Sequence, residues 1–385
     1  MKPTFYDTYI QDLKDKLYKN LFTTTLPKLK KSPLKDSPEE IFDHAMEYYK
    51  EHNQIKAKKY IINKVSNIQY IAKNEEGKSV EIAKGTFYLK HKPQIVNLYE
   101  ISTKLKGISL FQNFRFGTPV YTFKHIAKIA EEIQQFQPKK KNLIVFSLLS
   151  PCNNKICKSF SVVAKKGAKF SGLLKKGLSA TKEEVIIQKE LQASGKKIGT
   201  FNYNTILFPL SSQVYSGVGS KLIPVGVDTF IYAKDEYKKK IKDPKVKKIY
   251  DFIHLENDPS GKTAFESIIR IACYFFHSLR KDYILAYHCK SGKDRTSIFD
   301  AIQQSTYYYI NQHKEITGPD DLTLTDYEEI RHLAQKFLMY GLIVAFNSTS
   351  VVGLKLKNIP VAKYIFHDNK ELFNRFIGHS SIVSS

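Results

Sequence analysis

The sequence has few cysteines and no long apolar run, and both shortages exclude something. Four cysteines in 385 residues indicate a reducing compartment. The pair Cys152 and Cys157 lacks a second Cys or His pair at a suitable spacing, so free thiols are a better interpretation than a metal site. The longest apolar run, Phe337 to Phe346, is too short to cross a bilayer. We expect no metal, no cofactor and no transmembrane segment.

Acidic residues are also in the minority. Lys and Arg together number 61 against 37 Asp and Glu, a formal net charge of +24, and almost all of the excess is lysine. A compositional bias explains about half of this excess, and the rest fits an anionic membrane surface, where each nearby Lys contributes roughly 1 kcal/mol. No zinc-finger, RRM or helix-turn-helix signature is present, so a nucleic acid partner is not expected. No signal peptide follows Met1, and any membrane contact is expected to be peripheral.

One stretch, residues 288–296, concentrates the chemistry: His-Cys-Lys-Ser-Gly-Lys-Asp-Arg-Thr. The apolar run Tyr283 to Tyr287 before it has the pattern of a buried strand, and residues 297–302 after it have helical character. Backbone N–H groups curled around a glycine at a helix N-terminus form a nest for an anion. The stretch therefore predicts a loop that holds a phosphate against a thiolate.

Each residue type in the loop fits a step of phosphate-ester cleavage. Cys289 is the expected nucleophile, because nearby cations and a helix N-terminus favour its thiolate. Arg295 supplies a planar fork for two phosphoryl oxygens, which lysine cannot copy. Gly292 permits the turn, and Thr296 can donate its hydroxyl to the departing sulfur. Asp294 is repelled by a phosphate unless it carries the proton that the leaving alcohol needs.

The stretch resembles the C-x5-R signature of phosphoinositide phosphatases. In its CKSGKDRT form it is most similar to bacterial effector enzymes of the SopB and SidF kind and to eukaryotic inositol-polyphosphate 4-phosphatases. The resemblance covers only these nine residues and their strand and helix setting. It implies that Lys290 and Lys293 meet further phosphates of an inositol ring. The expected substrate-binding residues are His288, Lys290, Ser291, Gly292, Lys293 and, from a basic loop before residue 358, Lys355.

The general acid has two candidates. Asp258 lies 31 residues before Cys289, a separation that resembles the mobile-loop aspartate of dual-specificity phosphatases. It also fits an ordinary Asp-Pro turn before the next helix. Asp294 lies inside the loop, as in lipid phosphatases that share the Asp-Arg-Thr ending, or it merely orients Arg295. We favour Asp294, because its place beside the leaving oxygen needs no loop closure.

Alternating strand and helix patterns predict an α/β fold, and the resemblance implies the cysteine-phosphatase type, a central mixed sheet flanked by helices. Residues 141–385 are expected to form the catalytic domain and residues 1–140 an N-terminal cap or targeting region. Capping patterns predict helix starts at Ser37, Thr181 and Thr325. The Lys-rich run 238–248 is either a solvated helix face or a surface for lipid headgroups. Cys273 belongs to the core.

These observations predict a metal-independent phosphoinositide phosphatase that works through a cysteinyl-phosphate. The ring 3-position is slightly favoured and the 4-position is next. The alternatives are a protein tyrosine or dual-specificity phosphatase and a non-catalytic phosphoinositide-binding module. Residues 260–263 resemble the end of a Walker A loop, but its first glycine is replaced by Glu256. By resemblance alone, the protein is expected to be a secreted bacterial effector that acts at host membranes, and otherwise cytoplasmic.

Overall fold

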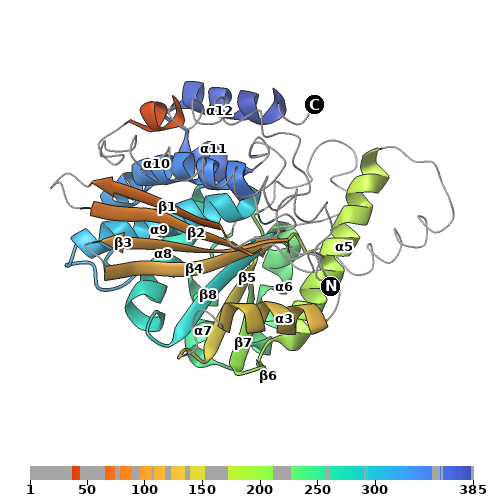
Figure 1. The fold of residues 1–385 in the computed structure, drawn as a ribbon. Coiled ribbons are helices and arrows are strands. Elements are labelled where there is room, and N and C mark those ends of the chain that lie inside the picture. Colours follow the sequence, from red (N-terminus) through yellow and green to blue (C-terminus); the bar gives the residue numbers. More distant parts are fainter. Residues whose placement is uncertain are drawn as a thin grey trace, which may run out of the picture.

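An eight-stranded mixed sheet runs through the molecule (Figure 1). The computed structural model describes residues 37–43, 66–73, 79–88, 96–105, 108–117, 123–134, 139–151, 172–210, 227–255, 258, 260–289, 292, 294–348, 356 and 359–382. The strand order is β1-β2-β3-β4-β8-β5-β7-β6. The strands are β1 (Ser66–Lys73), β2 (Ser79–Tyr88), β3 (Val96–Leu105), β4 (Ile108–Gly117), β5 (Asn142–Ser147), β6 (Lys196–Ile198), β7 (Phe201–Leu207) and β8 (Tyr283–Cys289).

Strand direction divides this sheet into two parts. Strands β1 to β4 form an antiparallel meander, whereas β4, β8, β5 and β7 run parallel, and β6 turns back along β7. The helices are α3 (Phe123–Gln134), α5 (Gly172–Ala193), α6 (Val227–Lys240), α7 (Pro244–Lys248), η2 (Ile249–Phe252), α8 (Lys262–Tyr274), η3 (Phe275–Leu279), α9 (Asp294–Gln312), α10 (Leu324–Ser348), α11 (Pro360–Ile365) and α12 (Lys370–Ile382). The expected α/β class with a mixed sheet is confirmed.

Strand β8 is buried on both faces, which explains its continuous apolar sequence. Its side chains alternate between two cores. Ile284 and Ala286 join the core beneath α3 and the end of α5, whereas Leu285 and Tyr287 join the larger core beneath α8 and α9. Because the alternation continues to the end of the strand, His288 and Cys289 leave it toward opposite faces of the sheet.

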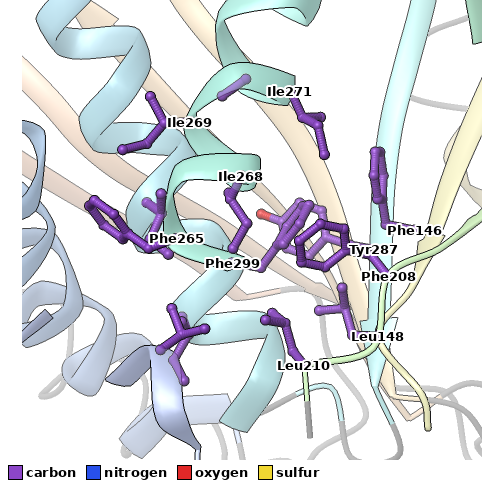
Figure 2. Close-up of a cluster of buried hydrophobic side chains, with 14 of the residues drawn as sticks. Phe146, Leu148, Phe208, Leu210, Phe265, Ile268, Ile269, Ile271, Tyr287 and Phe299 are labelled. Atoms are coloured by element: carbon purple, nitrogen blue, oxygen red, sulfur yellow. The ribbon is translucent and has the colours of Figure 1, made fainter. Parts of the chain in front are cut away.

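Phe299 of α9 is the centre of the aromatic packing in the larger core. Its ring lies 5.2 Å from that of Phe146 on β5, 5.2 Å from Tyr287 on β8 and 5.8 Å from Phe208 after β7. Figure 2 shows these rings meeting beside Ile268 of α8. Three parallel strands are thereby fixed against the first turns of α9, and those turns follow directly after residues 288–293.

Several local predictions are confirmed. The backbone N–H of Glu40 donates to Ser37 Oγ, and the Ser37 N–H donates to the Glu40 carboxylate, so the capping box there is real. The helix that it starts is described over residues 38–43, and Phe42 packs edge-on against Phe376 of α12. Gly195, with φ of 75°, follows the end of α5 as expected.

Two predicted helix starts were wrong. Thr181 lies inside α5, which begins at Gly172, and Glu183 and Glu184 are buried. Helix α10 begins at Leu324 and is capped by Thr323, whose Oγ1 accepts from Asp326 N while the Asp326 carboxylate accepts from Thr323 N at 2.6 Å. The pattern at Thr325 failed because Glu328 pairs with Arg331 instead.

The sheet continues across residue 140, the predicted domain boundary. Strand β4 lies before it and β8 after it, and they pair from Asn113 with Leu285 to Gly117 with Cys289. The first helix also contacts the far end of the chain, since Asn369 donates to Glu39 and Arg375 pairs with Asp43. A separate role for residues 1–140 stays a prediction.

Candidate active site

Cys289 is the last residue of β8, at the carboxyl end of the parallel strands. In the sheet, Cys289 pairs with Gly117 at the end of β4. The preceding residue, His288, pairs with Ser147 at the end of β5. Ligands of parallel α/β sheets bind in the crevice beyond these strand ends. Cys289 has only 2% of its surface exposed. A nucleophile there is shielded from bulk water.

Only glycine fits at position 292, because the backbone there lies against β4. Its φ is 67°, and a Cβ built there would lie 2.3 Å from Gly117 N and 2.4 Å from the carbonyl carbon of Phe116. The turn is closed by the Gly292 N–H, which donates to the Cys289 carbonyl at 3.3 Å. No L side chain fits this close approach to β4. The loop therefore turns tightly against the neighbouring strand, as the sequence predicted.

Arg115 of β4 supports this turn from behind. Its side chain is fully buried, and its guanidinium donates to the Gly292 carbonyl at 3.2 Å and to Ser297 Oγ at 2.9 Å. It also pairs with Asp300 of α9 at 3.4 Å, and Asp300 accepts from the Tyr287 hydroxyl. One side chain thus connects β4, the loop and the first two turns of α9. The sequence analysis missed it, because nothing local marks a buried arginine.

Helix α9 begins at Asp294, directly after the loop, so its first N–H groups face the same crevice. Asp294 is half-buried. Thr296 is fully buried, and its hydroxyl has no hydrogen-bond partner among the described residues. A buried hydroxyl without a partner is costly in a stable core and is more usual at a reactive site.

Arg295 is held by a carboxylate from α5. Its two terminal nitrogens lie 3.2 and 3.1 Å from the two oxygens of Glu183, and Nη1 also donates to the Leu148 carbonyl at 2.7 Å. Glu183 is itself fixed by the Ser150 N–H at 2.9 Å. Burial disfavours the charge of Arg295, but Glu183, with smaller contributions from Cys289 and Asp294, raises the pKa of the guanidinium. The planar fork is preorganised close to the thiol.

Glu183 is the second residue that the sequence analysis missed. It stands beside Glu184, the glutamate of the capping pattern predicted at Thr181, yet it lies in the middle of α5 and its partner lies 112 residues further along the chain. A usable signal was present, because the pair Glu183 and Glu184 lies in a helix with apolar neighbours, where carboxylates are rarely buried without a cation.

Asp258, the second candidate for the general acid, belongs to a turn that starts α8. Its Oδ1 accepts from Ser260 N at 2.8 Å and its Oδ2 from Thr263 N at 3.1 Å. Partial burial opposes ionisation, but these hydrogen bonds lower the pKa of Asp258. The carboxylate is therefore stabilised in its ionised form, which does not favour proton donation.

The remaining predicted residues divide into two groups. His288 is fully buried, with its ring stacked on Phe116 at 5.0 Å. Cys273 lies in the core, where burial raises the pKa of its thiol to about 12. The other predicted positions lie outside the described residues: Lys290, Ser291, Lys293, Lys355, Cys152 and Cys157.

The Lys-rich run 238–248 lies at the other end of the parallel strands. Asp243 accepts from the hydroxyl of Tyr283, the first residue of β8, and Lys245 pairs with Asp282 at 3.8 Å. Strand β8 is seven residues long and ends at Cys289, so this end of the strand lies about 20 Å from Cys289. The run therefore does not surround the candidate active site.

No family model matches the sequence, and no curated protein matches it. Among solved structures, a phosphoinositide phosphatase from Legionella matches with a TM-score of 0.42 and 12% identity, over 75% of this chain and 38% of that chain. Within the described part of the chain, no group of three or more His, Cys, Asp or Glu side chains is arranged for a metal ion, and no helix is long and apolar enough to cross a membrane.

The buried Arg115 and Asp300 pair generates the first prediction. Arg115→Met should lower the free energy of unfolding by about 3–5 kcal/mol at pH 7.5, because it leaves a buried carboxylate without its cation. Without Arg115, the folded-state pKa of Asp300, which burial already raises, rises further above its unfolded value. The defect should therefore shrink as the pH falls. Urea unfolding at pH 7.5 and pH 5.5 measures both effects.

The double variant Arg115→Met/Asp300→Leu is the control, since it removes both charges together. It should be more stable at pH 7.5 than Arg115→Met alone. Equal losses in the single and double variants, with no dependence on pH, would show that the ion pair is not what stabilises this region.

Proposed function

We propose that this protein is a phosphoinositide phosphatase of the cysteine-dependent kind. The observation that carries the proposal is the arrangement of Cys289 and Arg295, with the thiol at a strand end, the guanidinium preorganised by Glu183, and Gly292 and the α9 N-terminus between them. A cation fork, a helix N-terminus and a buried thiol on one loop are suited to an anion that undergoes nucleophilic attack.

In the proposed reaction, the Cys289 thiolate attacks phosphorus and the ester oxygen leaves with a proton from a general acid. Arg295 and the loop N–H groups hold the non-bridging oxygens as negative charge shifts during transfer. Water then attacks the cysteinyl-phosphate, and inorganic phosphate leaves as the thiolate is restored. The Thr296 hydroxyl, which lacks another partner among the described residues, is proposed to donate to the departing sulfur.

Asp294 is proposed as the general acid, in preference to Asp258. Both oxygens of Asp258 already accept backbone hydrogen bonds that favour its charged form. Asp294 starts α9 beside Arg295 and needs no loop movement to reach a leaving oxygen. Proton donation from within the loop is therefore the simpler mechanism.

An inositol lipid is proposed as substrate because the loop carries Lys290 and Lys293, which a monophosphate does not need. The ring 3-position is slightly favoured over the 4-position. We also propose, from the resemblance of the loop alone, that the protein acts at a membrane surface and is secreted as a bacterial effector. The alternatives remain a protein tyrosine or dual-specificity phosphatase, which has little use for these lysines, and a lipid-binding module, which has little use for Cys289.

Phosphate release from a panel of short-chain phosphoinositides and phosphopeptides tests the function. The wild type should hydrolyse the lipids in preference, and Cys289→Ser should abolish turnover while it retains lipid binding, because a serine hydroxyl stays protonated in an intact anion nest. Cys273→Ala, which alters a core thiol, is the matched control and should stay active. Preference for phosphopeptides, or binding without turnover in the wild type, would favour one of the two alternatives.

The loop lysines give a second test of substrate class. Lys290→Met and Lys293→Met should each lower kcat/KM for polyphosphorylated lipids, because each removes a charge-assisted contact that contributes about 1.5–3 kcal/mol to transition-state binding. Both should change hydrolysis of a small aryl phosphate much less. Lys239→Met, an exposed position at the end of α6, should alter neither. Equal losses on both substrates would mean that the lysines serve only to activate Cys289.

The general acid is identified by its dependence on the leaving group. Asp294→Asn should slow hydrolysis of an inositol lipid by roughly 10²–10⁴-fold, and of an activated aryl phosphate far less, because the activated phenolate departs without a proton. Asp258→Asn, which keeps the size of the side chain and one of its two acceptor oxygens, should change both rates little. If only Asp258→Asn shows the leaving-group dependence, the acid is Asp258.

A further inference from the structure

Basic residues are concentrated at the amino ends of the parallel strands. Four segments meet there, which together we call the amino-end face: residues 139–142 before β5, 195–202 around β6, 238–248 from the end of α6 through α7, and 280–283 at the start of β8. These 27 residues hold fourteen Lys and Arg against two Asp, a net charge of +12. Half of the formal charge of the chain therefore lies in less than a tenth of its length, which a uniform compositional bias does not produce.

Side-chain contacts join the four segments into one surface. Lys140 Nζ donates to the Tyr283 carbonyl at 3.2 Å, and the Tyr283 hydroxyl donates to Asp243 at 2.7 Å. The side chain of Lys242 lies against Gly195, since a Cβ built on that glycine would be 3.4 Å from Lys242 Cδ. In Figure 1, α7 and β6 lie at the lower end of the molecule, away from α10 and α12. The charge run of α6 and α7 is thus part of a larger basic surface.

Most of this charge faces solvent and is not neutralised by the two aspartates. Twelve of the fourteen cations are exposed. Asp243 accepts from the backbone N–H of Lys245 at the start of α7, and Asp282 pairs with the Lys245 ammonium at 3.8 Å. Asp251, just outside the face, pairs with Lys238. Like charges held at this density repel one another, so the face gains free energy when an anionic surface approaches it.

The residue types of the face favour a lipid surface over a nucleic acid or a protein. Thirteen of its cations are Lys, a point charge, whereas bidentate contacts to phosphates and bases use Arg. Its two aromatic residues, Phe201 and Tyr283, are buried, so no ring is available to stack on a base. In the described part of the chain, the exposed large apolar residues are Val185 and Leu324, and neither belongs to the face. A protein interface usually has an apolar centre, whereas adsorption of lysines to anionic headgroups needs none.

We propose that the amino-end face adsorbs this protein to an anionic bilayer, through charge alone and without insertion. The loop at Cys289 lies at the opposite ends of the same strands, about 20 Å away, so an adsorbed molecule holds this loop away from that bilayer. The face is therefore a tether. It is separate from the lipid that the loop is proposed to cleave, which has to reach the loop from a facing surface.

Co-sedimentation with vesicles tests the tether without any phosphatase assay. The vesicles contain phosphatidylcholine with about 30% phosphatidylserine and no phosphoinositide, and the wild type should bind at about 50 mM salt and be released at about 300 mM. The triple variant Lys239→Gln/Lys242→Gln/Lys247→Gln removes three exposed charges of the face. Each lysine near an anionic surface contributes roughly fivefold, so the partition coefficient at low salt should fall about 100-fold.

The matched control is Lys262→Gln/Lys363→Gln/Lys370→Gln, which removes the same charge from exposed positions on α8, α11 and α12. It should change the partition coefficient by much less. Absence of wild-type binding, or equal losses in the two triple variants, would overturn the proposal. Tighter binding to duplex DNA or to polyglutamate than to vesicles of equal charge would overturn the choice of a lipid surface.

Hydrogen exchange with and without the same vesicles tests the orientation. Amides of residues 195–202 and 238–248 should exchange more slowly on the vesicles, and those of residues 294–300 should not change. Slower exchange at residues 294–300 alone would show that the loop end adsorbs, and it would contradict the tether. Because neither measurement uses catalysis, failure of the tether is distinguishable from failure of the proposed phosphatase function.

Discussion

The bidentate contact between Arg295 and Glu183 is the interaction on which the site depends. A guanidinium beside a thiol would otherwise turn toward any available carbonyl, and a buried carboxylate on α5 would otherwise lack a cation. The two groups compensate each other's charge. The Ser150 N–H donates to Glu183 and the Leu148 carbonyl accepts from Arg295, so both side chains are fixed from the end of β5. If an anion binds at this loop, as proposed, its site is already formed, so little reorganisation is left for the binding step.

Successive side chains of β8 point to opposite faces of the sheet, so the residues that hold the loop lie in two layers. Cys289 and the turn at Gly292 are held from the α9 side, through Arg115 and Asp300, whereas His288 is held from the α5 side, through Glu190 and Phe116. Because both layers are densely packed on the same strand, movement of either one is transmitted to the strand end. The position of Cys289, the proposed nucleophile, therefore depends on the packing of the whole parallel part of the sheet.

The sequence predicted what local patterns determine. The apolar run before His288, the glycine in the loop and the helical character after Thr296 place strand, turn and helix where the structure has them. It failed where a local pattern has a distant partner. Glu183 stands inside the capping pattern predicted at Thr181 but binds an arginine 112 residues away, and Arg115 meets Asp300 across 185 residues. Register and burial are set by the assembled sheet, and a single sequence carries no direct record of them.

The position of the basic run limits how a membrane can be engaged. Lys245 lies at the amino end of β8 and Cys289 at its carboxyl end, about 20 Å apart. A bilayer lying against Lys245 and its neighbours would hold its headgroups at the amino ends of the parallel strands, where no phosphate can reach the thiol at the carboxyl end. If an inositol lipid is the substrate, the membrane must approach the strand ends where α5 and α9 meet the loop. The charge that attracts it there then has to come from groups near the loop, such as Lys290 and Lys293, and the Lys-rich run 238–248 serves solubility or another contact.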